Sequence, residues 1–238
     1  MKLGIFTDSH SCRDDVRNHT RRPALSIKKI EQAINAFKEA EVDLCLCLGD
    51  LIDKGKTPEE PVECLEEIMR LLRTSGVPYR MLSGNHDSRV FGTAEFSKRT
   101  DTPPSPCLLD TATHRLIFLD ACYSSDMMHY SSTPSERYSW KDSNLPTEQL
   151  DFLQSALRSS QKPCIVLLHQ NLESQADPNH RVNNAQKARQ IMEESNKVSL
   201  VLQGHYHKGG DRMENGIRYL TVPAMCEGEE NHYLILDL

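Results

Sequence analysis

The stretch Val198-Ser199-Leu200-Val201-Leu202-Gln203-Gly204-His205-Tyr206-His207 joins a run of strand-forming residues to a glycine and two histidines. In an extended backbone, side chains two positions apart point to the same side, so the two imidazoles can reach one small volume. Neutral imidazole is the commonest metal ligand in proteins. A His-x-His pair alone is weak evidence for a metal site, because most such pairs are incidental. The rest of the chain must therefore show whether other ligands converge on this pair.

Apolar patterning predicts an α/β protein. Residues 42–48 are almost continuously apolar, which is typical of a strand buried on both faces of a parallel or mixed sheet. Residues Thr57-Pro58-Glu59-Glu60 have the composition of a capped helix start. Residues 123–146 are polar and serine-rich, and we expect them to be irregular. We predict strands over 2–6, 42–48, 79–82, 115–119, 163–168, 198–202, 217–222 and 233–238, and helices over 26–40, from 57 to about 75, 148–157 and 184–194.

Length and composition narrow the class of protein. A chain of 238 residues can bury a substantial core in one or two domains, and we expect a single domain over 1–238. The net charge of −6 disfavours a dedicated nucleic-acid-binding protein. No apolar run approaches the ~18 residues of a membrane span. The first residues leave no room for a signal peptide, so a cytoplasmic location without membrane association is expected. The sequence does not indicate an oligomeric state.

The eight cysteines are expected to be reduced and mostly structural. Cys45 and Cys47 lie on one side of a single predicted strand, where they cannot bridge easily. No Cys-x-x-Cys pair indicates a zinc or redox site.

A local concentration of basic residues stands out against the acidic whole. It consists of Arg13, Arg17, Arg21, Arg22, Lys28 and Lys29, diluted by Asp14 and Asp15. Such a segment is most often a solvated face. It can also be an anion-attracting loop, because it begins just after Asp8 and His10.

Residues that bind metals or move protons directly follow five of the predicted strands. In open α/β sheets, sites form outside the carboxyl ends of the strands, so these residues are expected to converge. Other histidines, such as His19 and His232, are scattered without this relation to strands. The converging set is Asp8, His10, Asp50, Asn85, His86, His169, His205 and His207.

This ordered set resembles the calcineurin-like metallophosphoesterases that hold two metals. The corresponding motifs are Asp8-Ser9-His10, Gly49-Asp50, Gly84-Asn85-His86-Asp87, His169 and Gly204-His205-Tyr206-His207. The resemblance implies a single domain of two mixed β-sheets packed face to face and flanked by helices, a four-layer αββα sandwich. His169 is followed by Gln170-Asn171, which departs from the apolar-proline pattern common among relatives.

The resemblance also implies roles for the individual residues. One metal ion would be held by Asp8, His10 and His207, and the other by Asn85, His169 and His205, with Asp50 bridging both. His86 would protonate the leaving group, and Asp53 would hold His86, although Asp53 could also simply cap a turn. Arg89 and Asn85 would contact the substrate phosphate, and for Arg89 a surface salt bridge is an equal alternative.

The chemistry of the seven ligands agrees with these roles. Nitrogen and oxygen ligands without thiolate suit Mn, Fe, Co or Zn ions. Only Asp8 and Asp50 carry negative charge, so two divalent ions would leave a positive centre that attracts phosphate. Metal coordination lowers the pKa of water from ~16 toward ~7, which makes a hydroxide nucleophile available at neutral pH.

The expected function is hydrolysis of a phosphodiester, a phosphomonoester or a nucleotide pyrophosphate by that hydroxide. The motifs resemble those of bacterial cyclic-nucleotide or glycerophosphodiester phosphodiesterases, and residues 203–210 resemble manganese-dependent ADP-ribose/CDP-alcohol diphosphatases. The basic segment favours a nucleotide or a diphosphate over a neutral-headed ester. The expected partner is a phosphorylated small molecule or nucleotide, and stable nucleic-acid binding is not expected. The alternative is a binding module that keeps the fold without turnover.

Overall fold

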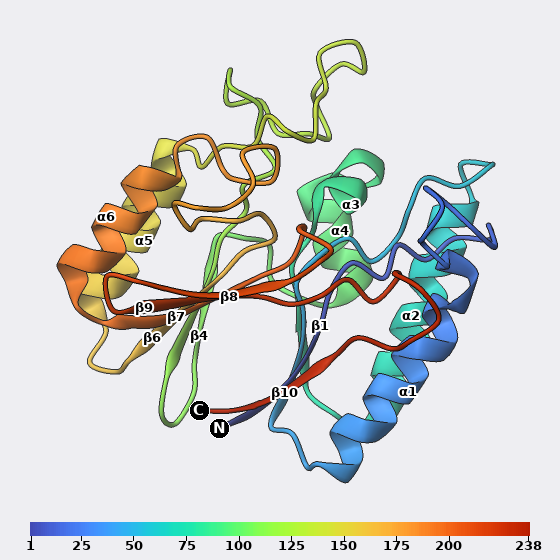
Figure 1. The fold of residues 1–238 in the computed structure, drawn as a ribbon, viewed down its shortest axis with the longest axis horizontal. Coiled ribbons are helices and arrows are strands. Elements are labelled where there is room, and N and C mark those ends of the chain that lie inside the picture. The colour runs from blue at the N-terminus through green and yellow to red at the C-terminus, as the bar shows by residue number, and fades with distance from the viewer.

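Two mixed β-sheets form the centre of the molecule in the computed structural model, which describes residues 1–238 (Figure 1). The four-stranded sheet has the order β10-β1-β2-β3 and the six-stranded sheet has the order β4-β5-β6-β7-β9-β8. The first sheet comprises β1 (Lys2–Phe6), β2 (Leu44–Cys47), β3 (Tyr79–Met81) and β10 (Leu234–Asp237). The second comprises β4 (Cys107–Asp110), β5 (Arg115–Phe118), β6 (Cys164–Leu167), β7 (Val198–Gln203), β8 (Gly210–Glu214) and β9 (Ile217–Thr221).

Parallel pairing dominates the interior of each sheet. Strand β2 pairs in parallel with β1 and β3, and the neighbours from β5 through β6 and β7 to β9 are also parallel. Antiparallel strands occur only at edges, where β10, β4 and β8 pair with β1, β5 and β9. Because the interior strands run the same way within each sheet, the residues that follow them leave at a common edge.

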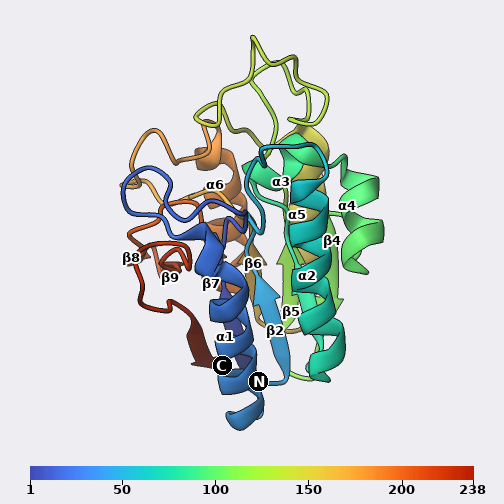
Figure 2. The same ribbon diagram turned by 90° about the vertical axis from the view of Figure 1, so that its right-hand side faces the viewer.

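Helices cover the outer face of each sheet and give the predicted four-layer sandwich (Figures 1 and 2). Helices α1 and α2 lie on the four-stranded sheet, and α5 and α6 lie on the six-stranded sheet. None of the helices is both long enough and apolar enough to cross a membrane. Their bounds are α1 (Ser26–Glu39), α2 (Glu60–Ser75), α3 (Asn85–Val90), α4 (Thr93–Thr100), α5 (Thr147–Ser159) and α6 (Ala185–Ser195), with a short 3-10 helix at Pro23–Leu25.

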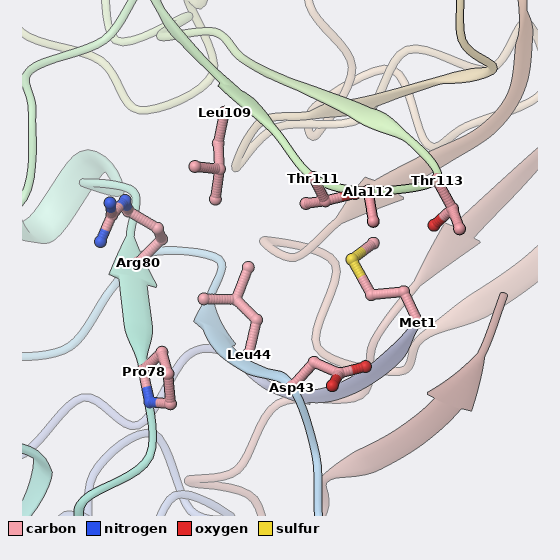
Figure 3. Close-up of a pocket in the computed structure, with 9 residues that line it drawn as sticks. All are labelled: Met1, Asp43, Leu44, Pro78, Arg80, Leu109, Thr111, Ala112 and Thr113. Carbon is pink, nitrogen blue, oxygen red and sulfur yellow. The ribbon is translucent and has the colours of Figure 1, made fainter.

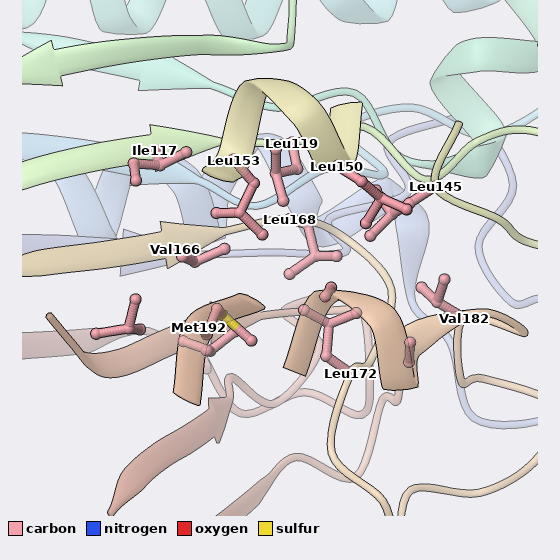
Figure 4. Close-up of a cluster of buried hydrophobic side chains, with 14 of the residues drawn as sticks. Ile117, Leu119, Leu145, Leu150, Leu153, Val166, Leu168, Leu172, Val182 and Met192 are labelled. Atoms are coloured by element: carbon pink, nitrogen blue, oxygen red, sulfur yellow. The ribbon is translucent and has the colours of Figure 1, made fainter. Parts of the chain in front are cut away.

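The strands are apolar on both faces because each sheet is covered on both sides. Along β6, Ile165 and Leu167 belong to the cluster between the sheets, whereas Val166 belongs to the cluster under α5 and α6 (Figure 4). Strand β2 alternates in the same way, with Leu44 and Leu46 between the sheets and the thiols of Cys45 and Cys47 toward α1 and α2. All eight cysteines are free, as the sequence predicted.

The predicted elements are confirmed within a few residues, with one wrong helix start. Helix α2 begins at Glu60 and not at Thr57. The carboxylate of Glu60 accepts hydrogen bonds from the backbone N–H groups of Arg13 and Lys56, at 2.8 and 2.9 Å, and these bonds hold the preceding residues as a loop. The sequence did not predict β4, β8, α3 or α4. These elements are short or lie at edges, so their apolar patterns are weak.

Helix α1 approaches β1 closely at Gly4, and this contact is testable. A Cβ at Gly4 would overlap the ring of Phe37, which is fully buried. We predict that Gly4→Ala lowers the free energy of unfolding by about 1–3 kcal/mol through overpacking. Gly210→Ala is the matched control, because a Cβ there meets nothing within 4 Å. Denaturant unfolding of both variants measures the difference, and equal stability would contradict the close packing.

Candidate metal centre

A polar pocket of about 390 Å³ opens at the carboxyl ends of the parallel strands. The four-stranded sheet supplies residues that follow β1, β2 and β3, and the six-stranded sheet supplies residues that follow β6 and β7. Both sheets therefore contribute to one site. The pocket is lined by Asn18, Arg21, Asp50, Asn85, His86, Trp140, His180, His205 and His207.

Several of the residues at the strand ends have backbone conformations that side chains rarely adopt. Asp8, His10, Asp50 and His205 have φ values of 51°, 45°, 52° and 65°. Left-handed backbone at non-glycine residues costs free energy and is concentrated at functional sites. These residues follow β1, β2 and β7, so three of the strands that supply the site end in such a backbone conformation. The glycine at position 84 permits a close approach, because a Cβ there would overlap the carboxylate of Asp50.

The first cluster joins Asp8, His10, Asp50 and His207. The Nε2 atoms of His10 and His207 lie 3.2 Å apart. His10 Nε2 is 3.6 Å from both Asp8 Oδ1 and Asp50 Oδ2, and His207 Nε2 is 3.5 Å from Asp8 Oδ1. Atoms that bind one ion at about 2.0–2.2 Å are separated from each other by about 3–3.6 Å. The cluster therefore has the dimensions of a single-ion site.

The second cluster joins Asp50, Asn85, His169 and His205. His169 Nε2 lies 3.3 Å from Asp50 Oδ2, and the ligand atoms of Asp50, His169 and His205 lie within 4.8 Å of one another. Asn85 is buried, and it lines the same pocket. Asp50 Oδ2 thus faces a histidine of each cluster.

The two clusters pass a direct test of whether they fit metal ions. Buried polar atoms are almost always hydrogen-bonded, so those without a partner need an explanation. Five such atoms belong to the clusters and have no hydrogen-bond partner: Asp8 Oδ1, His10 Nδ1, Asn85 Oδ1, His169 Nε2 and His205 Nε2. Each is an atom that could donate a lone pair to a cation.

In His207, His169 and Asp8, neighbouring groups hold the side-chain polar atom that does not face the other ligands. His207 Nδ1 lies 2.6 Å from Glu227 Oε1, and His169 Nδ1 lies 2.7 Å from the Leu48 carbonyl oxygen. Asp8 Oδ2 accepts bonds from the Thr7 hydroxyl and the His205 N–H, at 2.6 and 3.0 Å. Partners of this kind fix the tautomer and the ring orientation of metal-ligating histidines.

Burial lowers the pKa of His10 and His205, whereas nearby carboxylates raise the pKa of the other two cluster histidines, His169 and His207. Burial alone would lower the pKa of His169, but the carboxylates of Asp50 and Asp8 raise it to about 9. Burial would likewise lower the pKa of His207, but hydrogen bonding to Asp8 and contacts with Cys226 and Glu227 raise it to about 12. Cations near these carboxylates are stabilised, whether they are protons or metal ions.

His86 and Asp53 form a pair beside the clusters. His86 Nδ1 lies 2.9 Å from Asp53 Oδ1, and the imidazole of His86 borders the pocket. Burial would lower the pKa of His86, but the negative charges of Asp50 and Asp53 raise it. Asp53 also pairs with Arg17, whose Nη1 lies 2.9 Å from Oδ1. Asp53 does more than cap a turn, because its carboxylate holds both His86 and Arg17.

Some basic side chains of segment 13–29 lie at the candidate site, and others lie away from it. Arg17 and Arg21 turn toward the site, where Arg21 Nη2 lies 3.4 Å from His207 Nε2. Arg13 instead pairs with Glu67 at 2.6 Å, and Lys29 donates to backbone carbonyls of residues 225, 227 and 228. Of the six basic side chains, Arg21 lines the pocket and can meet an anion there, whereas Arg17 is engaged by Asp14 and Asp53.

Arg89 has partners outside the pocket. Its guanidinium donates to the carbonyl oxygens of Tyr130 and Thr133, each at 2.7 Å, and lies over the ring of Tyr138. It is absent from the pocket lining, and its partners are carbonyl oxygens and a hydroxyl in place of the carboxylate of a salt bridge. The contacts of Arg89 fix the 123–146 loop, which runs above the strand ends at the top of Figure 1.

Sequence reasoning missed five residues at the site. Glu227 and Cys226 follow a predicted strand by several residues, and the Cys226 thiol joins His10 and His207 as a group of possible ligand atoms within 4.8 Å. Asn18 lies in the basic segment, Trp140 lies in the serine-rich loop and His180 lies in the loop after β6. No local pattern distinguishes these residues, although Trp140 is the only tryptophan in the chain.

A second cavity, of about 500 Å³, lies at the opposite, amino ends of the strands (Figure 3). Met1, Leu44, Pro78, Arg80 and Leu109 are among its lining residues. No group of metal-ligating side chains borders it. The polar pocket is therefore the candidate site, although it is the smaller of the two.

These observations define a class of protein: a four-layer α/β sandwich with two overlapping clusters of nitrogen and oxygen ligands at the strand ends. The family profile of the calcineurin-like phosphoesterases matches residues 1–209. The chain belongs to that family.

Curated relatives are distant. The "Probable cyclic nucleotide phosphodiesterase" of Psychrobacter arcticus is 23% identical over 209 residues, which cover 83% of this chain and 67% of the relative. A protein of the same description from another Psychrobacter strain is 23% identical over 220 residues, which cover 88% of this chain and 61% of the relative. The chain thus spans about two thirds of the length of these relatives.

Solved structures share the fold across almost the whole chain. A dimetal phosphatase from Danio rerio superposes with a TM-score of 0.82 at 17% identity, covering 99% of this chain and 91% of that one. The protein TT1561 of Thermus thermophilus superposes with a TM-score of 0.60 at 10% identity, covering 94% and 89%. At these identities the likeness concerns the fold alone.

The Glu227 carboxylate gives a testable prediction about metal affinity. We predict that Glu227→Gln weakens binding of Mn²⁺ by about 10- to 100-fold, because His207 loses the charged partner that orients its ring. Glu230→Gln is the matched control, because Glu230 is exposed and lies outside the pocket lining. Calorimetric titration of Mn²⁺ into both chelator-treated variants measures the effect. Unchanged affinity in Glu227→Gln would contradict an orienting role.

Proposed function

We propose that this chain is a hydrolase that cleaves a phosphodiester, a phosphomonoester or a nucleotide pyrophosphate at a site with two divalent metal ions. The observation that carries the proposal is the position of Asp50. Its Oδ2 lies 3.6 Å from His10 Nε2 and 3.3 Å from His169 Nε2, so one carboxylate can serve both ligand clusters. We assign Asp8, His10 and His207 to one ion and Asn85, His169 and His205 to the other, with Asp50 shared.

Two bound ions of this kind supply Lewis acidity and lower the pKa of bound water, and Mn, Fe, Zn or Co suits the ligand set. The remaining roles belong to side chains of the pocket. His86 is assigned to donate the proton from Nε2 to the leaving oxygen, because Asp53 occupies Nδ1 and fixes the ring. Asp53 is in turn held by Arg17, which keeps this carboxylate in place.

The basic segment 13–29 favours a substrate that carries either several anionic groups or a charged phosphodiester. Arg21 borders the pocket beside His207, where its guanidinium can bind a nonbridging phosphate oxygen. The names of the Psychrobacter relatives agree with a nucleotide diester. Arg89 is assigned to hold the 123–146 loop in place of the substrate contact expected from sequence, because its guanidinium donates to loop carbonyls.

The proposal is tested with bis-p-nitrophenyl phosphate, p-nitrophenyl phosphate and ADP-ribose as substrates. We expect Mn²⁺-dependent hydrolysis of at least one of them, and we expect its loss on addition of a chelator. A folded preparation that binds Mn²⁺ but hydrolyses none of the three would instead support the binding module. A panel of cyclic nucleotides, CDP-alcohols and glycerophosphodiesters then identifies the substrate class.

Two substitutions separate proton donation from metal binding. We predict that His86→Ala keeps the metal content but loses about 10²- to 10⁴-fold in turnover, because the leaving group loses its acid. Asp50→Ala is expected to lose both metal and turnover, because both clusters share this carboxylate. Metal analysis and hydrolysis assays of the two variants are compared with those of His232→Ala, whose side chain lies outside the pocket. Normal diester hydrolysis by His86→Ala would refute its assignment as the acid.

A further inference from the structure

The candidate pocket has two chemically different walls. Asn18 and Arg21 form a polar and cationic wall beside His207. Trp140 and His180 form the wall beside His205. Among the nine lining residues, Trp140 is the one whose side chain is mainly hydrocarbon. The pocket therefore offers charge recognition on one side and an aromatic surface on the other.

Trp140 lines the pocket and does not pack in the hydrophobic core. Its ring centroid lies 5.1 Å from that of His180 and 5.5 Å from that of His205, with interplanar angles of 52° and 72°. It belongs to none of the three hydrophobic clusters, and its side chain is partly accessible to solvent. The hydrophobic effect within the core therefore does not explain its position.

The loop that carries Trp140 is fixed by contacts on both sides of it. Asp142 accepts hydrogen bonds on its carboxylate from the Asn183 amide, at 2.9 Å, and on its backbone carbonyl from the Tyr130 hydroxyl, also at 2.9 Å. Arg89 binds the carbonyl oxygens of Tyr130 and Thr133. A surface held by this many bonds is pre-organised, which lowers the entropy lost when a ligand binds.

We propose that Trp140, together with His180, forms a stacking subsite that selects substrates bearing a planar aromatic group, such as a nucleobase, attached to the phosphate. This inference rests on the proposed function, because the phosphate is taken to lie over the ligand clusters. Stacking on an aromatic side chain tolerates any base, since every base has a π-face. Trp140 is thus a specificity-determining residue, and Arg21 on the opposite wall receives the anionic part of the ligand.

The competing explanation is that Trp140 only shields His205 and His180 from water. The two explanations differ in a measurable way, because shielding affects all phosphate ligands equally whereas stacking affects only those with a planar group. AMP and ribose 5-phosphate form a matched pair, since they share the sugar phosphate and differ in the base.

Trp140 is the only tryptophan of the chain, so tryptophan fluorescence reports on this side chain alone. Mn²⁺-loaded protein is titrated with each ligand, and calorimetry gives both affinities. Phosphate release is followed in the same samples to account for turnover. We expect saturable quenching by AMP and an affinity for AMP at least about 5-fold higher than that for ribose 5-phosphate.

Substitutions test whether the side chain of Trp140 causes the preference for AMP over ribose 5-phosphate. Trp140→Ala is expected to weaken AMP binding by about 5- to 30-fold and to leave ribose 5-phosphate within about 2-fold, whereas Trp140→Phe keeps most of the preference. Tyr233→Ala is the matched control, because Tyr233 is 38% exposed and lies outside the pocket lining. Equal affinity of the wild type for both ligands, unchanged fluorescence at saturation, or a preference that survives in Trp140→Ala would overturn the inference.

Hydrolysis of bis-p-nitrophenyl phosphate by the wild type is measured in parallel. Hydrolysis without a preference for AMP would refute the stacking subsite and leave the proposed function intact. A preference for AMP without hydrolysis of any test substrate would refute the proposed function and retain the subsite as a binding site.

Discussion

The buried carboxylate of Asp50 is the constraint on which the rest of the site depends. Its side chain is 2% exposed, and an isolated charge at such a position would be strongly unfavourable. Its Oδ1 accepts the backbone N–H of His86 at 2.8 Å, and its Oδ2 faces the imidazoles of His10 and His169. Burial would raise the pKa of Asp50, but the nearby histidines hold it well below its usual range. The Asp50 carboxylate therefore stays negatively charged, and cations close to it stabilise that charge.

The two-sheet architecture makes that arrangement attainable. A single sheet edge would deliver residues along one line, whereas two sheets packed face to face deliver residues from opposite sides. Asp8, Asp50 and Asn85 come from the four-stranded sheet, and His169 and His205 come from the six-stranded sheet. The buried leucines and isoleucines between the sheets fix their separation. Packing far from the pocket thus sets the distances among the ligands.

The metal-ligating turns and the pocket walls have different structural origins. The proposed ligands follow the strand ends closely, in short turns held by backbone hydrogen bonds such as Asp8 N–H to the Gly49 carbonyl at 2.9 Å. The walls come from longer segments, the basic segment before α1, the loop before α5 and the loop before α6. Rigid short turns suit ligands that must meet within tenths of an ångström. Longer loops suit substrate recognition, because they can vary without disturbing the core.

Much of the fold and the candidate metal ligands could be predicted from the sequence alone. Apolar runs that end in Asp, Asn or His identify strands and their carboxyl ends, because strand periodicity is a local property of the chain. The same local information could not place Glu227 against His207, Arg17 against Asp53, or Trp140 beside His205. Nor could it show that Arg89 holds a loop. These contacts join residues at least 20 positions apart through irregular segments, whose paths are set by tertiary packing and not by any periodic pattern.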